Sequence, residues 1–276
     1  MRRLLLPFLL ASAAAAADIR TEHDVDYLGA GRAEKADLYL PAEVPPGQKF
    51  PAVLIIHGGG WIGGDKRAAR EINIGTTLAQ NGYVGMSINY LLAKADHPGP
   101  TWPQNLHDCK TAVRWLRANA ERLNIDPERI GVIGGSAGGH LAAMVGLTGP
   151  ELDPPGQGDC RVRCAVNLYG PVLWFEQRDL PMFRKTRAEA PELYRQADPR
   201  THVDKDDPPL LILHGTADKT VAVADSEALA AALKSVGAPH ELVIIPDAPH
   251  TFHLQPAQRD LRPRVLGFFD RYLKSP

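Results

Sequence analysis

The chain has 276 residues, of which 44% are hydrophobic and 23% are charged, a composition typical of a folded globular protein rather than of a disordered or fibrous chain. Lys and Arg number 31 and Asp and Glu number 32, so no basic field is available to hold nucleic acid or an anionic membrane surface. Three cysteines are too few for a disulfide framework or a zinc site. We expect one compact domain that binds no nucleic acid.

The first 17 residues have the pattern of a secretory signal. Arg2 and Arg3 precede a run from Leu4 to Ala17 that is apolar except for Ser12 and ends in small residues, as a cleavable signal does. The run is shorter than the roughly 20 residues that a transmembrane helix needs. We expect a signal peptide at residues 1–17, a single mature domain at residues 18–276 that is secreted or periplasmic, and no stable membrane insertion.

Along the mature chain, short β-branched runs alternate with longer helical patterns, which favours parallel strands joined by crossover helices. The predicted fold class is therefore α/β, with a mostly parallel central sheet and helices on both faces. In chain order, strands are expected at residues 37–40, 52–57, 83–89, 130–134, 165–169, 210–214 and 241–245, and helices at residues 66–80, 103–123, 137–147, 223–235 and 258–274.

One long segment, residues 170–208, interrupts this alternation. It holds several aromatic residues among four prolines and has no sustained helical or strand period. An excursion of this length inside a compact domain is usually functional, so we expect a cap over a site; the alternative is a segment that only covers the sheet.

A glycine-rich loop at residues 57–61 lies at the end of the second expected strand. Consecutive glycines let main-chain N–H groups turn inward, so Gly59 and Gly60 are candidate oxyanion donors. His57 is expected to hold this loop rather than to act in catalysis. Trp61 is a candidate substrate-binding residue, with packing beneath the loop as the alternative.

Residues 134–138 read Gly-x-Ser-x-Gly between an expected strand and an expected helix. A serine on such a sharp turn has crowded neighbours, and flanking glycines let the backbone pass closely. The turn exposes the hydroxyl of Ser136 as a candidate nucleophile. The free backbone N–H of Ala137, at the start of the helix, is a third oxyanion donor.

A serine nucleophile needs a base and an orienting acid, and in a parallel sheet both are expected just beyond strand ends. Asp218 follows one late strand and His250 follows the next, which gives the chain order Ser, Asp, His. The competing acids are Asp247 and Asp225, and the competing bases are His253 and His214. No metal-binding, phosphate-binding or dinucleotide motif follows any strand, so no cofactor or metal is expected.

With these residues assembled, the sequence resembles α/β-hydrolase esterases, and most of all the bacterial carbohydrate esterases that include bifunctional acetylxylan and feruloyl esterases. The resemblance implies an α/β-hydrolase fold with a small cap inserted after the sixth core strand, a nucleophile, acid and base at Ser136, Asp218 and His250, and oxyanion donors at Gly59, Gly60 and Ala137. The resemblance covers nearly the whole mature chain from about Asp37 onward, and the segments that carry it are residues 57–61, 107–110, 112–117, 126–130, 134–140, 169–171 and 206–209.

The sequence departs from this family at residues 89–91, where Asn-Tyr-Leu replaces the usual Asp-Tyr-Arg. The missing arginine puts in doubt any ion pair that it would make, for example with Asp108, but it removes no member of the triad.

The leading hypothesis is an exported serine carboxylic ester hydrolase that acts, through an acyl-enzyme, on short-chain acyl or feruloyl esters of a small molecule or plant polysaccharide. The alternatives are an arylformamidase, amidase or peptidase on the same triad, and a non-catalytic binding protein. The acyl and alcohol specificity, the oligomeric state and the pairing of Cys160 with Cys164 stay open.

Overall fold

The computed structural model describes residues 18–153 and 156–274. The predicted signal peptide at residues 1–17 therefore lies outside the described residues. Within the described residues, no helix combines the length and apolar character that crossing a bilayer requires.

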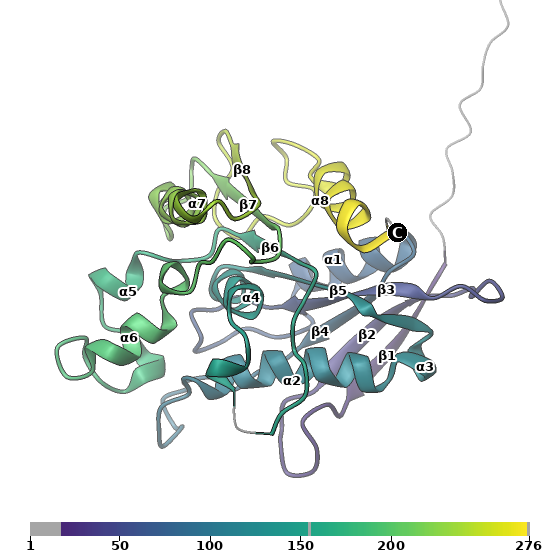
Figure 1. Ribbon diagram of the computed structural model, residues 1–276, viewed down its shortest axis with the longest axis horizontal. Helices are drawn as coiled ribbons and strands as arrows, with labels where there is room; N and C mark the ends of the chain where they lie inside the picture. The colour runs from purple at the N-terminus through teal and green to yellow at the C-terminus, as the bar shows by residue number, and fades with distance from the viewer. Residues whose placement is uncertain (1–17, 154–155, 275–276) are drawn as a thin grey trace, which may run out of the picture.

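An eight-stranded sheet runs through the molecule (Figure 1). The strand order is β1-β2-β4-β3-β5-β6-β7-β8, and all pairs from β4 onward are parallel, whereas β1–β2 and β2–β4 are antiparallel. The bounds are β1 (Ile19–Val25), β2 (Ala36–Pro41), β3 (Phe50–Ile56), β4 (Val84–Ile88), β5 (Ile125–Gly135), β6 (Cys164–Leu168), β7 (Leu210–Gly215) and β8 (His240–Ile245).

Helices cover both faces of the sheet, which explains why its central strands are continuously hydrophobic. In β3, Val53 and Ile55 pack on the side of α1 and α8, whereas Leu54 and Ile56 pack on the side of α2, α4 and α7. The bounds are α1 (Ala69–Gln80), α2 (Gln104–Ala118), α3 (Ala120–Leu123), α4 (Ala137–Leu147), α5 (Trp174–Gln177), α6 (Pro191–Ala197), α7 (Val223–Val236) and α8 (Arg262–Phe269), with shorter turns η1 (Pro150–Leu152), η2 (Pro181–Phe183), η3 (Pro199–Thr201) and the π-helical η4 (Asp270–Lys274).

Three elements differ from those predicted. Strand β1 was not predicted, because its sequence IRTEHDV is largely polar and partly exposed on this sheet edge. The helix expected at residues 103–123 is two helices, α2 and α3, which meet at Asn119. The last helix begins at Arg262 rather than at residue 258, after a loop in which Leu261 N–H bonds back to Leu254 O.

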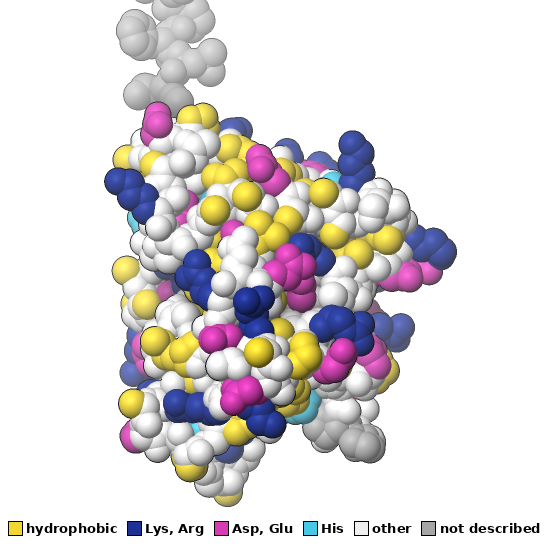
Figure 2. Space-filling model, turned by 90° about the vertical axis from the view of Figure 1, so that its left-hand side faces the viewer, with side chains coloured by type: hydrophobic (Ala, Val, Ile, Leu, Met, Phe, Trp, Pro, Cys, Tyr) yellow, Lys and Arg dark blue, Asp and Glu magenta, His cyan; other side chains and the backbone are white. Residues whose placement is uncertain are grey.

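The excursion at residues 170–208 contains α5, η2, α6 and η3, and it projects beyond α4 at the left of Figure 1. The contacts that anchor it to the sheet domain include hydrogen bonds to His140 and to Asp225. His140 Nε2 on α4 donates to Ala197 O over 2.8 Å, and the Asp225 carboxylate accepts the N–H groups of Val172 and Leu173. In Figure 2, which faces this side, basic and acidic side chains are interspersed and no single-sign patch forms.

The ion pair that the sequence put in doubt is made by another arginine. Arg32, which precedes β2, donates to both carboxylate oxygens of Asp108, over 3.1 and 2.7 Å. The backbone N–H of Leu91, at the position of the missing arginine, also donates to this carboxylate. Asp108 is fully buried, so a partner from a distant segment satisfies a charge that would otherwise be costly to bury.

All three cysteines are free thiols in this structure. Cys164 is buried in the apolar cluster on the side of α1 and α8. Cys160 lies 3.3 Å from a carboxylate oxygen of Asp153, which in turn pairs with Arg114 of α2, on the other side of the sheet. The two thiols therefore have separate environments rather than a shared one.

Candidate active site

Ser136 occupies the turn between β5 and α4 with φ 58° and ψ −125°. A positive φ is rare for a residue with a side chain, and it is held here because β5 and α4 leave no room for another path. A Cβ at Gly134 would lie 2.1 Å from Gly138 O, so glycine is required where the strand and the helix meet. The hydroxyl is thereby presented beyond the carboxyl end of the sheet.

His250 and Asp218 complete a hydrogen-bonded relay with this serine. His250 Nε2 lies 3.0 Å from Ser136 Oγ, and His250 Nδ1 lies 2.6 Å from Asp218 Oδ2. The acid is fully buried, and its other oxygen accepts the N–H groups of Thr220 and Val221 over 2.8 and 2.9 Å. The arrangement is that of a serine nucleophile with a general base and an orienting acid.

The four rival residues have other contacts. His214 Nε2 donates to Val221 O over 3.0 Å and also lies 3.3 Å from Asp218 Oδ2, and burial lowers the pKa of His214. His253 Nδ1 accepts from the backbone of Gln255. Asp225 anchors the excursion, as described above, and Asp247 is exposed.

The glycine loop after β3 faces the serine. Gly59 and Gly60 have φ values of 116° and 62°, and Gly59 O accepts the N–H groups of Ile62 and Gly63, which closes a tight turn. Within residues 18–153 and 156–274, the backbone N–H groups of Gly59, Gly60 and Ala137 have no hydrogen-bond acceptor. They are therefore available to a developing oxyanion.

A cavity of about 530 Å³ contains Ser136 and His250. Part of its wall is apolar and comes from Ala68, Ala69 and Trp174. The excursion therefore contributes an indole to the active site. The other lining residues are His57, Gly58, Gly59, Gly60, Gly64, Asp65, Arg70, Glu71, Thr220 and Thr251.

The proposed substrate-binding role of Trp61 needs correction. Trp61 is only 1% exposed and is absent from the cavity wall. It packs edge-on against Trp174 and His140, which is the alternative position that the sequence left open. The backbone of Trp61 has a φ of 60°, and a single sequence does not reveal that conformation.

Tyr169 is a positioning residue that the sequence pattern did not identify as functional. Its hydroxyl donates to Phe252 O, two residues beyond His250, over 2.6 Å, and accepts from Arg70 Nη1 over 3.0 Å. Its ring lies 4.8 Å from that of His250. The sequence feature that could have identified Tyr169 is its place in residues 169–171, one of the segments that carry the family resemblance.

Replacing Tyr169 with phenylalanine should lower kcat about fivefold, because one buried hydrogen bond worth roughly 1 kcal/mol no longer fixes the His250 loop. KM should change little, since Tyr169 is not part of the cavity wall. Steady-state kinetics would measure both. The matched control is Tyr83→Phe, which removes a hydroxyl bonded to Asp270 away from the site; equal effects of the two variants would contradict the positioning role.

Acid should weaken the fold through His140. Burial lowers the pKa of His140 to about 4, below the unfolded value of about 6.5, so its contribution to stability is complete above pH 6.5 and is lost as the pH falls toward 4. At pH 5 the expected loss is about 2 kcal/mol. His57, whose pKa burial also lowers to about 4, should add a similar loss.

Urea unfolding at pH 7 and pH 5 would measure this effect. The decrease in unfolding free energy should be smaller in His140→Gln than in the wild type, because glutamine does not titrate. A decrease of the same size in both proteins would show that His140 takes up no proton on unfolding.

The sequence of this chain matches a known family and named esterases. The BD-FAE family matches residues 36–233. Esterase LipQ of Mycobacterium tuberculosis is 31% identical over 245 residues, which are 84% of this chain and 57% of LipQ. The chain therefore spans little more than half of the length of mycobacterial relatives such as LipQ.

Solved structures of esterases share the fold. A truncated carbohydrate esterase from gut microbiota aligns with a TM-score of 0.80 at 27% identity, covering 95% of this chain and 99% of that one. Esterase 2 of Thermogutta terrifontis, phosphorylated by paraoxon, aligns with a TM-score of 0.70 at 27% identity, covering 94% and 93%. The predicted α/β-hydrolase fold is confirmed.

Proposed function

This chain belongs to the BD-FAE family, and from that membership we propose that it is an exported serine carboxylic ester hydrolase acting on short-chain acyl or feruloyl esters of plant polysaccharide. The observation that carries the proposal is the relay from Ser136 through His250 to Asp218, with distances of 3.0 and 2.6 Å. Export rests on the residue pattern of positions 1–17.

The geometry supports acyl transfer in two steps. Ser136 Oγ attacks the ester carbonyl carbon while His250 Nε2 takes its proton, and Asp218 stabilises the resulting imidazolium. The N–H groups of Gly59, Gly60 and Ala137 donate to the oxyanion, where each donor of this kind contributes about 2.7–4 kcal/mol of transition-state stabilisation. On collapse, His250 returns the proton to the leaving alcohol, and water then releases the acid by the same route.

Two observations support the substrate class. The structural neighbour described above is a carbohydrate esterase by name. The cavity beside Ser136 has apolar walls at Ala68, Ala69 and Trp174, which favour an acyl chain or aromatic ring over a charged group.

The test is hydrolysis by residues 18–276, beside the Ser136→Ala variant, of a chain-length series of p-nitrophenyl esters, acetylated xylan and methyl ferulate. We expect kcat of the variant to fall by at least about 10³-fold, because the nucleophile is removed. Equal activity in both proteins would overturn the mechanism. A large preference for matched amides over esters would instead favour an amidase.

Export has its own test. The full chain produced in a bacterium with a Sec pathway should be recovered outside the cytoplasm and should begin at Asp18 by N-terminal sequencing. Retention of residues 1–17 on a cytoplasmic product would refute the signal peptide and leave the hydrolase proposal intact.

A further inference from the structure

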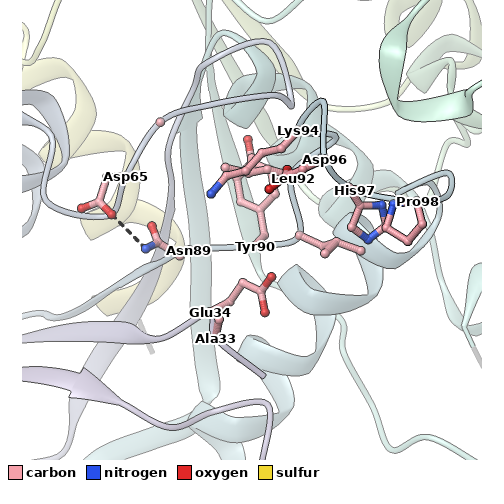
Figure 3. Close-up of a pocket in the computed structure, with 12 residues that line it drawn as sticks. Ala33, Glu34, Asp65, Asn89, Tyr90, Leu92, Lys94, Asp96, His97 and Pro98 are labelled. Carbon is pink, nitrogen blue, oxygen red and sulfur yellow. Dashed lines mark hydrogen bonds between the residues drawn. The ribbon is translucent and has the colours of Figure 1, made fainter. Parts of the chain in front are cut away.

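Figure 3 shows a second hollow, of about 370 Å³. Its lining comes from residues 33–34, 64–65, 89–92, 94 and 96–98, and we call it the side hollow. Three chain segments build it: the one before β2, the loop after β3 and the loop after β4. Its volume lies within the range of small-molecule sites.

The side hollow and the active-site cavity share a wall. Gly64 and Asp65 line both of them, so a ligand that reaches across these two residues occupies both spaces. The loop after β4 holds the loop after β3, which carries the shared wall, in place. Asn89 Nδ2 donates to Asp65 over 2.9 Å, and Ala93 N–H donates to Trp61 O over 2.8 Å. The site is thus largely formed before a ligand arrives.

Two charged side chains on the rim of the side hollow have no polar partner among the described residues. In the part of the chain that the structure describes, neither the Lys94 ammonium nor the Asp96 carboxylate has a hydrogen-bond or ion-pair partner, and both residues are exposed. The groups across from them are held in place: Glu34 pairs with Arg32 over 2.8 Å, and Asp65 is held by Asn89. Figure 3 shows these labelled side chains around the hollow.

The charge of this lining selects among ligands. Carboxylates at positions 34, 65 and 96 outnumber the ammonium of Lys94, so an anionic ligand is disfavoured. No group of three or more potential metal-ligating side chains forms there or elsewhere among the described residues. A neutral polyhydroxylated ligand fits, because a hydroxyl can both accept from an ammonium and donate to a carboxylate. The half-buried Leu91 and Leu92 add apolar surface to the lining.

The two spaces therefore differ in chemistry in the same way as the two halves of a sugar ester. The cavity beside Ser136 has apolar walls suited to an acyl group, and the side hollow has a polar rim suited to a carbohydrate. We propose that the side hollow is a subsite for a neutral sugar unit of the alcohol part of the substrate, adjacent to the unit whose ester bond is cleaved. This proposal rests on the proposed esterase function.

Kinetics with two substrates test the subsite. The Lys94→Ala/Asp96→Ala variant should show a KM for acetylated xylotetraose about tenfold above wild type, because the polar contacts of these two side chains with the sugar hydroxyls are lost. Its kcat for acetylated xylotetraose, and its kcat and KM for p-nitrophenyl acetate, should stay within about twofold of the wild-type values. p-Nitrophenyl acetate has no sugar to bind in the subsite. A parallel loss on both substrates, or no loss on either, would overturn the subsite.

The control variant is Lys205→Ala/Asp206→Ala. These two exposed residues pair with each other just before β7, at the amino ends of the parallel strands and thus at the opposite edge of the sheet from the site. The control should match the wild type with both substrates. It removes the same two residue types, so an effect of charge removal alone would appear in it as well.

Binding to the inactive Ser136→Ala protein separates this proposal from the esterase function. Calorimetry should detect binding of xylotetraose to this protein. The affinity should fall about tenfold when Lys94 and Asp96 are also replaced. Xylotetraose that bears glucuronic acid should bind more weakly than xylotetraose itself. Binding of xylotetraose that is insensitive to both replacements would place the sugar elsewhere and refute the subsite. Hydrolysis of p-nitrophenyl esters without any sugar binding would refute the subsite alone, whereas no ester hydrolysis at all would refute the proposed function.

Discussion

Replacing Asp218 with asparagine is expected to lower kcat by about 10⁴-fold while KM stays nearly unchanged, the size of effect that this substitution has in Ser-His-Asp triads. The reason lies in how the carboxylate is held. Its Oδ1 accepts two backbone N–H groups, from Thr220 and Val221, so the asparagine carbonyl should keep that side. The amide N–H₂ would then face His250 Nδ1.

An amide donor at that position reverses the tautomer of His250. Nδ1 would become the acceptor and Nε2 would carry the proton, so Nε2 could no longer take the proton of Ser136. The protein should remain folded, because the shape of the side chain is preserved. Steady-state kinetics on p-nitrophenyl acetate would measure the effect.

Asp247→Asn is the matched control, because Asp247 is the rival acid in the loop of His250 and is exposed. Its kcat should stay within about twofold of the wild type, as is usual for a surface substitution away from the reacting groups. A large loss in this variant with little loss in Asp218→Asn would reassign the acid to the histidine loop.

Replacing Gly138 with alanine should lower the free energy of unfolding by about 3 kcal/mol or more, at the upper end of what forced overpacking causes. A Cβ at this position would lie 2.1 Å from Ile56 O and 2.5 Å from His57 O. Both are backbone oxygens, so neither moves aside by a side-chain rotation. Either α4 or the end of β3 must shift.

The same shift would disturb catalysis in any protein that still folds, because α4 begins directly after Ser136 and the oxyanion loop follows His57. Gly267→Ala is the control with the opposite sign. Gly267 lies inside α8 with no atom within 4 Å of a built Cβ, so alanine should raise the unfolding free energy by roughly 0.5–1 kcal/mol. Urea unfolding followed by circular dichroism measures both, and similar values for the two variants would contradict the steric argument.

Several features of this protein were determined by the sequence alone, because they depend on neighbours along the chain. Alternating apolar runs and helical patterns predicted the α/β class, and Gly-x-Ser-x-Gly between a strand and a helix predicted the turn at Ser136. Asp218 and His250 followed from their positions just after strands, since parallel strands bring their carboxyl ends to one edge of the sheet.

Other features depended on distances between remote segments, which only the tertiary structure decided. Trp61 is buried against His140 and Trp174, whereas Trp174 lines the cavity, and the residues next to each tryptophan in the sequence do not specify either position. Arg32 reaches Asp108 across 76 positions of the chain, and Tyr169 reaches the His250 loop across 83. Local sequence determines which conformation a segment prefers, but the pairing of buried charges and the packing of aromatic side chains are set by which segments the completed sheet and helices bring into contact.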